Sequence, residues 1–379
     1  MSTSTQSKRT HWASLGTVLL ACLIAISFAD VTSAQGRRKG KRDKKRGSKR
    51  SKKAPRATII LDRGRELENV EIREEKWAAI KYRAKGTRRV EEVRGEKVLE
   101  IRYVDADPVY SSGVSRVRAG LYKRAVESFD KVLGALEDDN SWTWFYSTYW
   151  RGEAKRLSGD AKGAASDLKA LTDKDPEHFL APRAFFALGL AHGALKSASE
   201  AEAAFTKLDQ GFGQVWAAKA QLGLGDAYLM MGKLLEARRA YGLAGSRSQG
   251  DPNLRLGAQV GEAKCMVMRK EFDGALKTFA SILRQKGISP AVMAAAYAGK
   301  GDCLRAQGES TSNNETLKKA LLAFQTVVVR FAGVPESYPR SLFRSAELYA
   351  KLGLEKLAEL QRKELRSRCP SSPWTAKLP

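Results

Sequence analysis

One spacing of residues recurs through roughly the last 270 positions of the chain and constrains the fold more than any other feature. A small residue is followed twelve positions later by alanine, and four positions after that by phenylalanine, tyrosine or leucine. The spacing occurs at Gly113, Ala125 and Phe129; Gly152, Ala164 and Leu168; Gly189, Ala201 and Phe205; Gly225, Ala237 and Tyr241; Ala263, Ala275 and Phe279; and Ala346 and Ala358. Repeats with this period are typical of stacked helix pairs, which bury their apolar faces only against their neighbours.

The residues around this spacing resemble the tetratricopeptide repeat. The second unit contains Gly152, Gly159, Ala164 and Leu168 and ends near Pro176. The resemblance covers about residues 107–379 and implies a mainly α fold, an open right-handed superhelix of about seven helix pairs. In that family the first helix of each pair lines a concave groove that binds peptides or helices of other proteins. The same reading predicts that the protein is not an enzyme.

Three places depart from the pattern. Lys196 and Lys270 stand where glycine is expected between two helices, and the fifth unit allows a two-residue shift. In the sixth unit Gly301 and Ala320 are 19 positions apart, and the excess falls on the polar segment 308–315, which we expect to form an inter-helix loop. The ending Arg368-Cys369-Pro370-Ser-Ser-Pro373-Trp374 partly resembles the close of repeats in bacterial cell-envelope proteins of this class.

Residues 57–105 change to a period of two, which predicts short half-buried strands. Apolar residues alternate in short runs at Ile59 and Leu61, Val70 and Ile72, Ile80 and Tyr82, and Leu99, Ile101 and Tyr103. Strands this short predict a small all-β domain, either a curled sheet or a barrel that resembles SH3-like and Sm-like barrels. A domain of this size is marginal alone, so we expect it to lean on the first helices.

The N-terminal residues resemble an export leader followed by a basic arm. Residues 1–34 combine an early positive charge, an uncharged run at 12–29 and small residues before Gln35, which predicts a signal peptide or a membrane anchor. Residues 35–56 form a basic arm with 13 Lys and Arg between positions 37 and 56, and we expect it to be disordered. The expected location is therefore the periplasm, or the inner membrane through residues 12–29.

Six aromatic residues lie between positions 142 and 150, and two interpretations of them remain open. The repeat register turns Tyr146 and Tyr149 into the groove, where they would lie with Glu153 and Arg156; the alternative is packing against the small β domain. Carrying the groove positions of the resembled family along the chain adds the candidates Arg183, Phe186, Leu190, Lys219, Leu222, Asp226, Arg340, Phe343 and Glu347.

The sequence shows no catalytic motif, and it predicts no metal and no cofactor. Of its three histidines, His192 falls at a core position of the repeat and His178 in a loop, while Cys265 and Cys303 fit buried small side chains. The predicted function is a protein–protein interaction scaffold of the cell envelope. The alternative is a surface-tethered protein whose residues 37–56 bind nucleic acid, anionic lipid or acidic polymer. A monomer and a homo-oligomer both remain open.

Overall fold

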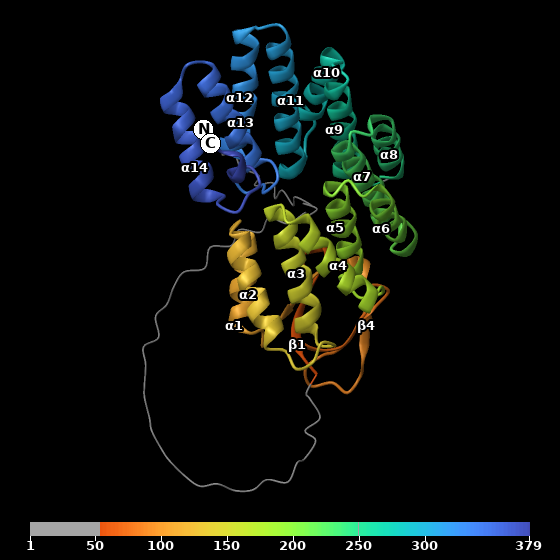
Figure 1. Cartoon of the computed structure of the whole chain (residues 1–379). Helices are drawn as coiled ribbons and strands as arrows, with labels where there is room; N and C mark the ends of the chain where they lie inside the picture. Colours follow the sequence, from red (N-terminus) through yellow and green to blue (C-terminus); the bar gives the residue numbers. More distant parts are fainter. Residues whose placement is uncertain (1–53, 249) are drawn as a thin grey trace, which may run out of the picture.

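The structure, a computed structural model, describes residues 54–248 and 250–379. A five-stranded sheet comes first and a long array of helices follows (Figure 1). The strands are β1 (Arg56–Leu61), β2 (Glu66–Glu75), β3 (Ile80–Arg83), β4 (Glu91–Val93) and β5 (Val98–Tyr103). The helices of this part of the chain are α1 (Pro108–Arg118), α2 (Tyr122–Gly134), α3 (Trp142–Ser158), α4 (Ala161–Lys174), α5 (Ala181–Ala194), α6 (Ala198–Gly211), α7 (Gln214–Met231), α8 (Leu234–Arg247), α9 (Pro252–Met268), α10 (Phe272–Leu283), α11 (Pro290–Ser310), α12 (Asn314–Arg330), α13 (Tyr338–Lys351) and α14 (Glu355–Arg368). The expected fold class, a helical-repeat solenoid of seven pairs after a small β domain, is confirmed.

The sheet is antiparallel, with the strand order β4-β3-β2-β1-β5. Its buried face carries the alternating apolar residues, among them Ile59, Ile80 and Ile101, each at most 4% exposed. The short edge strand β4 has no alternating apolar pattern that would predict it, because two of its three residues are exposed glutamates. The sheet starts at Arg56, whose guanidinium pairs with Asp105, so the last residue assigned to the basic arm belongs to β1.

Close contact between the two helices of a pair explains the repeated spacing. The small residue lies on the first helix, under the large side chain of the second. A Cβ added at Gly189 would lie 2.5 Å from the ring of Phe205, and one at Gly225 would lie 2.6 Å from the ring of Tyr241. At these two positions only glycine leaves room for the fully buried ring, and this close approach fixes how these two hairpins pack.

The inter-helix turns of the third and fifth hairpins keep the same geometry without glycine. Gly159 and Gly232 end their helices with φ of +91° and +79°, in the left-handed region. Lys196 and Lys270 occupy the equivalent positions with φ of +60° and +64°. The two-residue shift considered for the fifth unit is therefore wrong, and the register continues with Phe279 fully buried.

The extra residues of the sixth unit are helical, which corrects the predicted loop at 308–315. Helix α11 runs to Ser310 and α12 begins at Asn314, so the turn contains only residues 311–313. Ser312 adopts φ of +51°, and the Asn313 side chain accepts a hydrogen bond from the backbone of Thr316 at 3.0 Å. The insertion lengthens both helices and presents no separate loop surface.

The first helices of the hairpins form the inner side of the array. Helix α5 packs against α7, α7 against α9 and α9 against α11, in addition to the contacts within each hairpin. We call the surface formed by α3, α5, α7, α9, α11 and α13 the inner face. Neighbouring second helices lie farther apart, so the array curves around this face.

The two ends of the helical array meet, whereas the sequence predicted an open superhelix. In Figure 1 the last helix, α14, lies close to the first hairpin, α1 and α2. The backbone amide of Lys123 donates to Ser371 Oγ at 3.3 Å, and the Arg156 guanidinium lies 3.7 Å from Glu336. The curvature accumulated over seven hairpins brings the C-terminal segment back to the first two.

The described residues contain no helix both long enough and apolar enough to cross a bilayer. The predicted leader at 1–34, with its uncharged run at 12–29, lies outside them. Residues 35–53 of the predicted basic arm also lie outside the described part of the chain.

Candidate functional site

The β domain docks across the beginnings of α3, α5 and α7. The segment before α5 continues the sheet, because the amide of Trp77 donates to the carbonyl of Glu177 at 2.8 Å and that of Phe179 to the carbonyl of Glu75 at 3.1 Å. One buried apolar cluster spans the sheet and helices α3 to α5. The expectation that the small sheet leans on the first helices is confirmed by these contacts.

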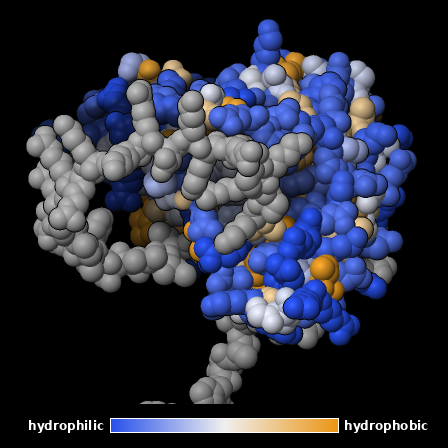
Figure 2. All heavy atoms as spheres, turned by 90° about the horizontal axis from the view of Figure 1, so that it is seen from below, coloured by the Kyte–Doolittle hydropathy of each residue, from blue (hydrophilic) through white to orange (hydrophobic). Residues whose placement is uncertain are grey.

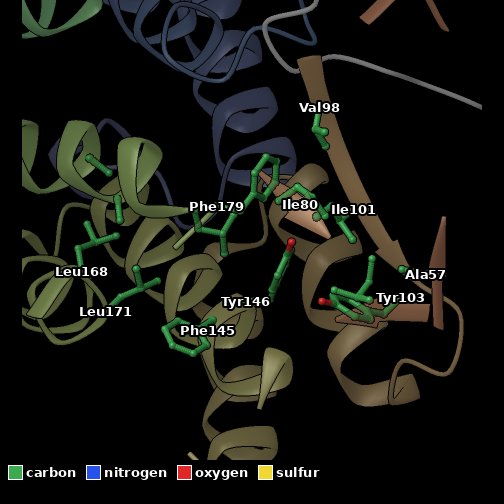
Figure 3. Packing of buried hydrophobic residues seen from close by; sticks show 14 of the residues in the cluster. Ala57, Ile80, Val98, Ile101, Tyr103, Phe145, Tyr146, Leu168, Leu171 and Phe179 are labelled. Atoms are coloured by element: carbon green, nitrogen blue, oxygen red, sulfur yellow. The ribbon is translucent and has the colours of Figure 1, made fainter. Parts of the chain in front are cut away.

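A buried polar group, Glu75, lies at the centre of this joint. Its carboxylate accepts hydrogen bonds from the hydroxyl of Tyr103 at 2.5 Å and from that of Tyr146 at 2.6 Å. His178 Nε2 lies 3.8 Å away, while Nδ1 of the same ring accepts from the amide of Leu180 at 3.1 Å. In Figure 3, Tyr146 reaches from α3 toward Tyr103 on the sheet.

Burial sets the charge of this cluster. It raises the pKa of Glu75 to about 7 and lowers the pKa of His178 to about 4, because both side chains are removed from water. The His178 ring is also stacked on Phe145 at 4.1 Å, which holds it in place. The cluster therefore joins the two parts of the protein with a group that titrates near neutral pH.

Tyr146 does not face a groove, and its placement in the candidate site is corrected. It is 5% exposed and packs edge-on against Tyr103, while Trp142 stacks on Tyr103 at 3.8 Å. Packing against the β domain is the correct interpretation for these residues. The reason is the Glu75 carboxylate, which is buried and therefore needs the Tyr146 hydroxyl as a donor.

Tyr149, Glu153 and Arg156 lie one to three helical turns farther along α3 and are half-buried on the inner face. The Arg156 guanidinium binds Glu153 at 3.0 Å and reaches Glu336, which precedes α13 and is 68% exposed. Burial raises the pKa of Tyr149, whose nearest charged groups include Glu153 and Arg183. These three residues are therefore half-buried on α3, and their predicted role in binding a partner stays a prediction.

Four candidates on α5 and α7 mainly serve hairpin packing. Phe186 meets Phe205 edge-on at 6.0 Å, Leu190 packs in the same cluster, and Leu222 packs against the cluster of Tyr241. Asp226 accepts a hydrogen bond from the Tyr241 hydroxyl at 2.7 Å, and burial raises its pKa. All four side chains are half-buried, so each still presents part of its surface.

Arg183 and Lys219 differ from the other candidates because they carry charge without a carboxylate partner. The Arg183 guanidinium lies over the ring of Phe179 at 4.7 Å, and the Lys219 ammonium over the ring of Trp216 at 4.4 Å. One nitrogen of Arg183 donates to the carbonyl of Leu99 at 3.1 Å. Among the described residues, no ion pair involves either side chain.

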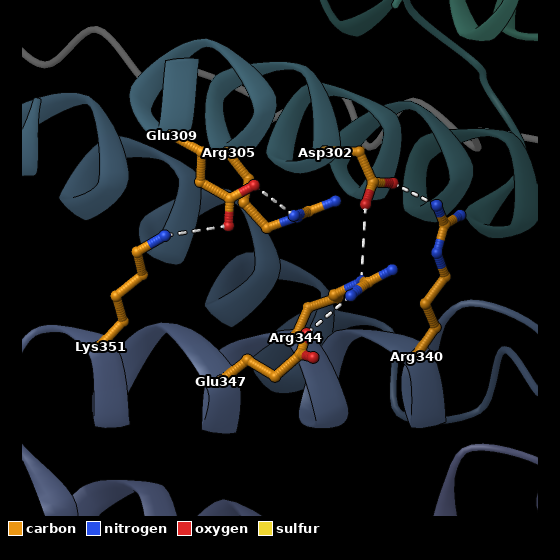
Figure 4. A network of polar contacts seen from close by, with 7 residues as sticks. All are labelled: Asp302, Arg305, Glu309, Arg340, Arg344, Glu347 and Lys351. Carbon is orange, nitrogen blue, oxygen red and sulfur yellow. Dashed lines mark hydrogen bonds and ion pairs between the residues drawn. The ribbon is translucent and has the colours of Figure 1, made fainter. Parts of the chain in front are cut away.

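The candidates near the C-terminus are engaged within the array, as Figure 4 shows. Arg340 forms an ion pair with Asp302 on α11, and Glu347 binds Arg344 at 2.7 Å. Phe343 is 8% exposed and packs against Trp374 at 5.3 Å, so its predicted place in an open groove is wrong. The C-terminal segment that returns to the first hairpins covers it.

A cleft of about 460 Å³ opens at the same joint, between the β2–β3 turn, the loop before α5 and the end of α6. Its apolar lining includes Trp77, Phe185 and Phe212, and its rim includes Lys81 and Lys207. Nothing in the period-two pattern identified Trp77 as a docking residue. An isolated tryptophan at the end of a strand was the available signal.

Of the remaining reactive side chains, Cys265 and Cys303 are buried within the array, while His192 and Cys369 are half-buried. Burial raises the pKa of the Cys303 thiol to about 12 and also raises that of Cys265, so both are protonated at neutral pH. His192 Nδ1 is buried and has no hydrogen-bond partner in the described part of the chain. In residues 54–248 and 250–379, no three histidine, cysteine or acidic side chains are grouped as a metal site requires.

Apolar side chains on the outer surface are dispersed. The face seen in Figure 2 is mainly hydrophilic, with apolar residues scattered over it. The most exposed examples are Leu235 on α8, Leu322 and Val329 on α12, and Leu360 on α14, which are 69%, 69%, 77% and 58% exposed. Scattered residues of this kind are ordinary for a protein surface.

Comparison with solved structures finds helical repeat proteins. A tetratricopeptide repeat protein from Parabacteroides merdae ATCC 43184 is 14% identical with a TM-score of 0.43, and the match covers 69% of this chain and 91% of that protein. A Rap protein complexed with Competence and Sporulation Factor is 14% identical with a TM-score of 0.43, covering 70% and 76%. The apo form of RapI is 15% identical with a TM-score of 0.38, covering 71% and 78%. No protein-family model and no curated protein sequence matches the chain.

Proposed function

We propose that this protein is a non-catalytic protein–protein interaction scaffold that binds peptides or helices of partner proteins on the inner face of its repeats. One observation carries this proposal. Tyr149, Arg183 and Lys219 come from three successive first helices, α3, α5 and α7, and all three are half-buried beside the docked β domain. A surface that combines aromatic and cationic residues on rigid helices is typical of sites that anchor a partner.

Site-specific photocrosslinking tests the location of binding. A photoreactive amino acid replaces Leu222 on α7, a half-buried inner-face residue, or Leu235 on the adjacent α8, which is 69% exposed. Both positions start as leucine, so the pair is matched. The proposal expects defined crosslinked partners from position 222 and none in common from position 235. Equal crosslinking at both positions, or crosslinking at 235 alone, would contradict binding on the inner face.

The cleft beside Trp77 provides a third position in the same experiment. Ala78 lines this cleft and is exposed, so a photoreactive residue there reports binding at the joint with little disturbance of packing. Capture at position 78 together with 222 would extend the binding surface onto the β domain. Capture at 78 without 222 would place the partner on the joint and contradict the inner-face site.

We further propose that residues 1–34 export the protein to the cell envelope. The order of charged, uncharged and small residues in this segment supports the proposal. Fractionation of the natural host, with N-terminal sequencing of the recovered protein, tests it. A mature chain that begins near residue 35 in the periplasmic fraction supports cleavage and export, an intact chain in the inner membrane supports an anchor, and an intact chain in the cytoplasm contradicts both.

The basic segment 37–56 favours a second candidate function, binding of a polyanion or an anionic membrane, because 13 of its 20 residues are basic. A variant with glutamine in place of the Lys and Arg residues at positions 37–53 separates the two functions. Partner crosslinking at position 222 that survives this change supports the scaffold. Loss of crosslinking in the glutamine variant would favour the basic segment as the binding element.

A further inference from the structure

Three aromatic rings from separate parts of the chain form one cluster at the joint. Trp77, in the turn between β2 and β3, stacks on Phe179 with ring centroids 6.3 Å apart. Its other neighbour is Trp216 at the beginning of α7, which it meets edge-on at 6.0 Å. The cluster therefore connects the β domain, the segment before α5 and the first turn of α7.

Two cationic groups lie on this cluster. The guanidinium of Arg183 lies over Phe179, and the ammonium of Lys219 lies over Trp216, both within 5 Å of the ring centroids. Each residue precedes the small residue of its repeat, Gly189 or Gly225, by six positions, so the repeat itself places them side by side on α5 and α7. Aromatic faces favour both cations but do not neutralise them.

Within the described residues, Arg183 and Lys219 lack the carboxylate partner that the equivalent residue has in another repeat. Arg340 is the equivalent residue on α13, and it pairs with Asp302 on α11 within the ladder of Figure 4. Arg183 Nη1, in contrast, is buried and has no hydrogen-bond partner among the described residues. A buried guanidinium N–H without an acceptor is costly, so its retention needs an explanation.

The pKa shifts of Arg183 and Lys219 also indicate that nearby acidic groups do not compensate for the burial of these two cations. Burial lowers the pKa of Arg183 and that of Lys219, and the positive charge of Arg183 lowers the pKa of Lys219 further. Tyr149, Tyr146 and Glu100 act on Arg183, and Asp251 acts on Lys219, but these groups do not offset the burial. Two cations are thus held near each other and partly removed from solvent, where an anion is bound more strongly than at an exposed site.

We propose that Arg183 and Lys219 form an anion-binding site at the joint between the β domain and the repeats, one that accepts an oxyanion such as a carboxylate or a phosphate. The Arg183 guanidinium and the Lys219 ammonium supply the donors, and the rings they lie over, Phe179 and Trp216, form the apolar wall together with Trp77. The oxyanion comes from one of two sources, a free small anion or an acidic side chain of a bound peptide. The second source rests on the proposed scaffold function.

A titration of the full-length protein with inorganic phosphate tests the site. The melting temperature and the calorimetric heat are followed at constant ionic strength, with chloride as the balancing anion. The wild type should bind phosphate saturably and melt at a higher temperature in its presence. Lys219→Met, which keeps the apolar stem, should weaken binding at least tenfold. Lys233→Met is the matched control, because Lys233 also lies over an aromatic ring, Tyr228 at 5.6 Å, but is exposed.

The melting temperature without phosphate gives a second measurement, in case a variant folds poorly. Lys219→Met removes a half-buried ammonium that has no ion-pair partner among the described residues, so it should melt at a higher temperature than the wild type in chloride alone. A lower melting temperature would mean that Lys219 is already satisfied within the protein, and it would overturn the proposal. Two further results would also overturn the proposal, unless the peptide experiment described next succeeds. One is that the wild type does not bind phosphate, and the other is that all three proteins bind it equally.

The two sources of the oxyanion are separated by a peptide arm. A hexapeptide of alternating Glu and Ala is compared with the same peptide carrying Gln in place of Glu. Binding of the Glu peptide that needs Lys219 identifies an acidic peptide side chain, and binding of phosphate alone identifies a free anion. Failure of both probes overturns the site. Because this titration uses no partner, its failure is distinguishable from failure of the crosslinking experiment at position 222.

Discussion

The same substitution at two glycines of α9 should change stability in opposite directions. Gly257 and Gly261 are one helical turn apart in the interior of this helix. A Cβ added at Gly257 would have its nearest neighbour, Leu222 Cδ2, at 3.7 Å, which is an ordinary contact. A Cβ at Gly261 would lie no more than 2.5 Å from three ring carbons of Tyr241. The pair isolates steric fit from helix propensity.

The magnitudes follow from two opposing effects. Alanine in place of glycine in a helix interior stabilises by about 0.5–1 kcal/mol. Gly257→Ala should therefore stabilise the protein by about that amount. At Gly261 the Tyr241 ring is fully buried and its hydroxyl is bound to Asp226, so it cannot retreat. Overpacking of a rigid core costs about 1–3 kcal/mol, which exceeds the propensity gain, so Gly261→Ala should destabilise.

Thermal unfolding followed by circular dichroism measures both variants against the wild type. The direction of the shift is the decisive result, because repeat arrays do not always unfold in one step. A third protein, Gly261→Ala combined with Tyr241→Ala, provides the control. Relative to Tyr241→Ala alone, the methyl group added by Gly261→Ala should no longer destabilise the protein. A higher melting temperature for Gly261→Ala alone, similar to that of Gly257→Ala, would refute the claim that the buried Tyr241 ring leaves no room for a Cβ at Gly261.

Three further predictions follow from buried or strained groups. Burial raises the pKa of Glu75 from 4.5 to about 7, so between these pH values only the folded state keeps the proton and stability falls as the pH rises. Glu75→Gln removes this loss, so between pH 4.5 and pH 7 its free energy of unfolding should rise by about 3 kcal/mol relative to that of the wild type, as measured by urea unfolding. Parallel plots of unfolding free energy against pH for the two proteins would contradict the raised pKa of Glu75. Lys196→Gly places glycine where the backbone is left-handed and should stabilise the protein by up to about 1 kcal/mol. Lys207→Gly, within α6, is the control and should destabilise the protein by a similar amount. A melting temperature of Lys196→Gly at or below that of Lys207→Gly would contradict the turn geometry. Trp374→Ala removes the ring packed against Phe343 and should destabilise by about 2 kcal/mol in urea unfolding, with an unchanged midpoint as the contrary result.

The helical part of the fold was predictable because its signal is local. Gly189 and Phe205 are 16 residues apart, and their contact lies within one hairpin, so spacing alone encodes it. Two inter-helix turns were harder to recognise from the sequence, because Lys196 and Lys270 adopt the left-handed backbone conformation in which glycine is usual. The polar composition of 308–315 suggested a loop, but these residues extend helices whose outer surfaces are solvated and tolerate polar side chains.

The closure of the array was not predictable from the same information. The contact between Lys123 and Ser371 joins residues that are 248 positions apart. It depends on small rotations that accumulate from hairpin to hairpin, and no single spacing reports them. Phe343 is covered for the same reason, because the segment that covers it follows the last helix and takes its direction from the whole array.

The candidate site was predictable in its register but not in its environment. Tyr146 and Arg183 both precede the small residue of their repeat by six positions, Gly152 and Gly189. The β domain then gives them different roles: Tyr146 donates to the buried Glu75, and Arg183 donates to the carbonyl of Leu99. A repeat motif describes the helix on which a side chain stands, but a separate domain decides what that side chain meets.

The β domain therefore has a structural task that its small size does not suggest. Its contacts with Trp142 on α3, with Phe179 before α5 and with Trp216 on α7 hold three successive hairpins in one arrangement. Removing it would free Tyr146 and expose Trp216, and it would take away the Leu99 carbonyl that orients Arg183. The inner face between α3 and α7 is consequently a composite of sheet and repeats, and an anion site there exists only in the assembled protein.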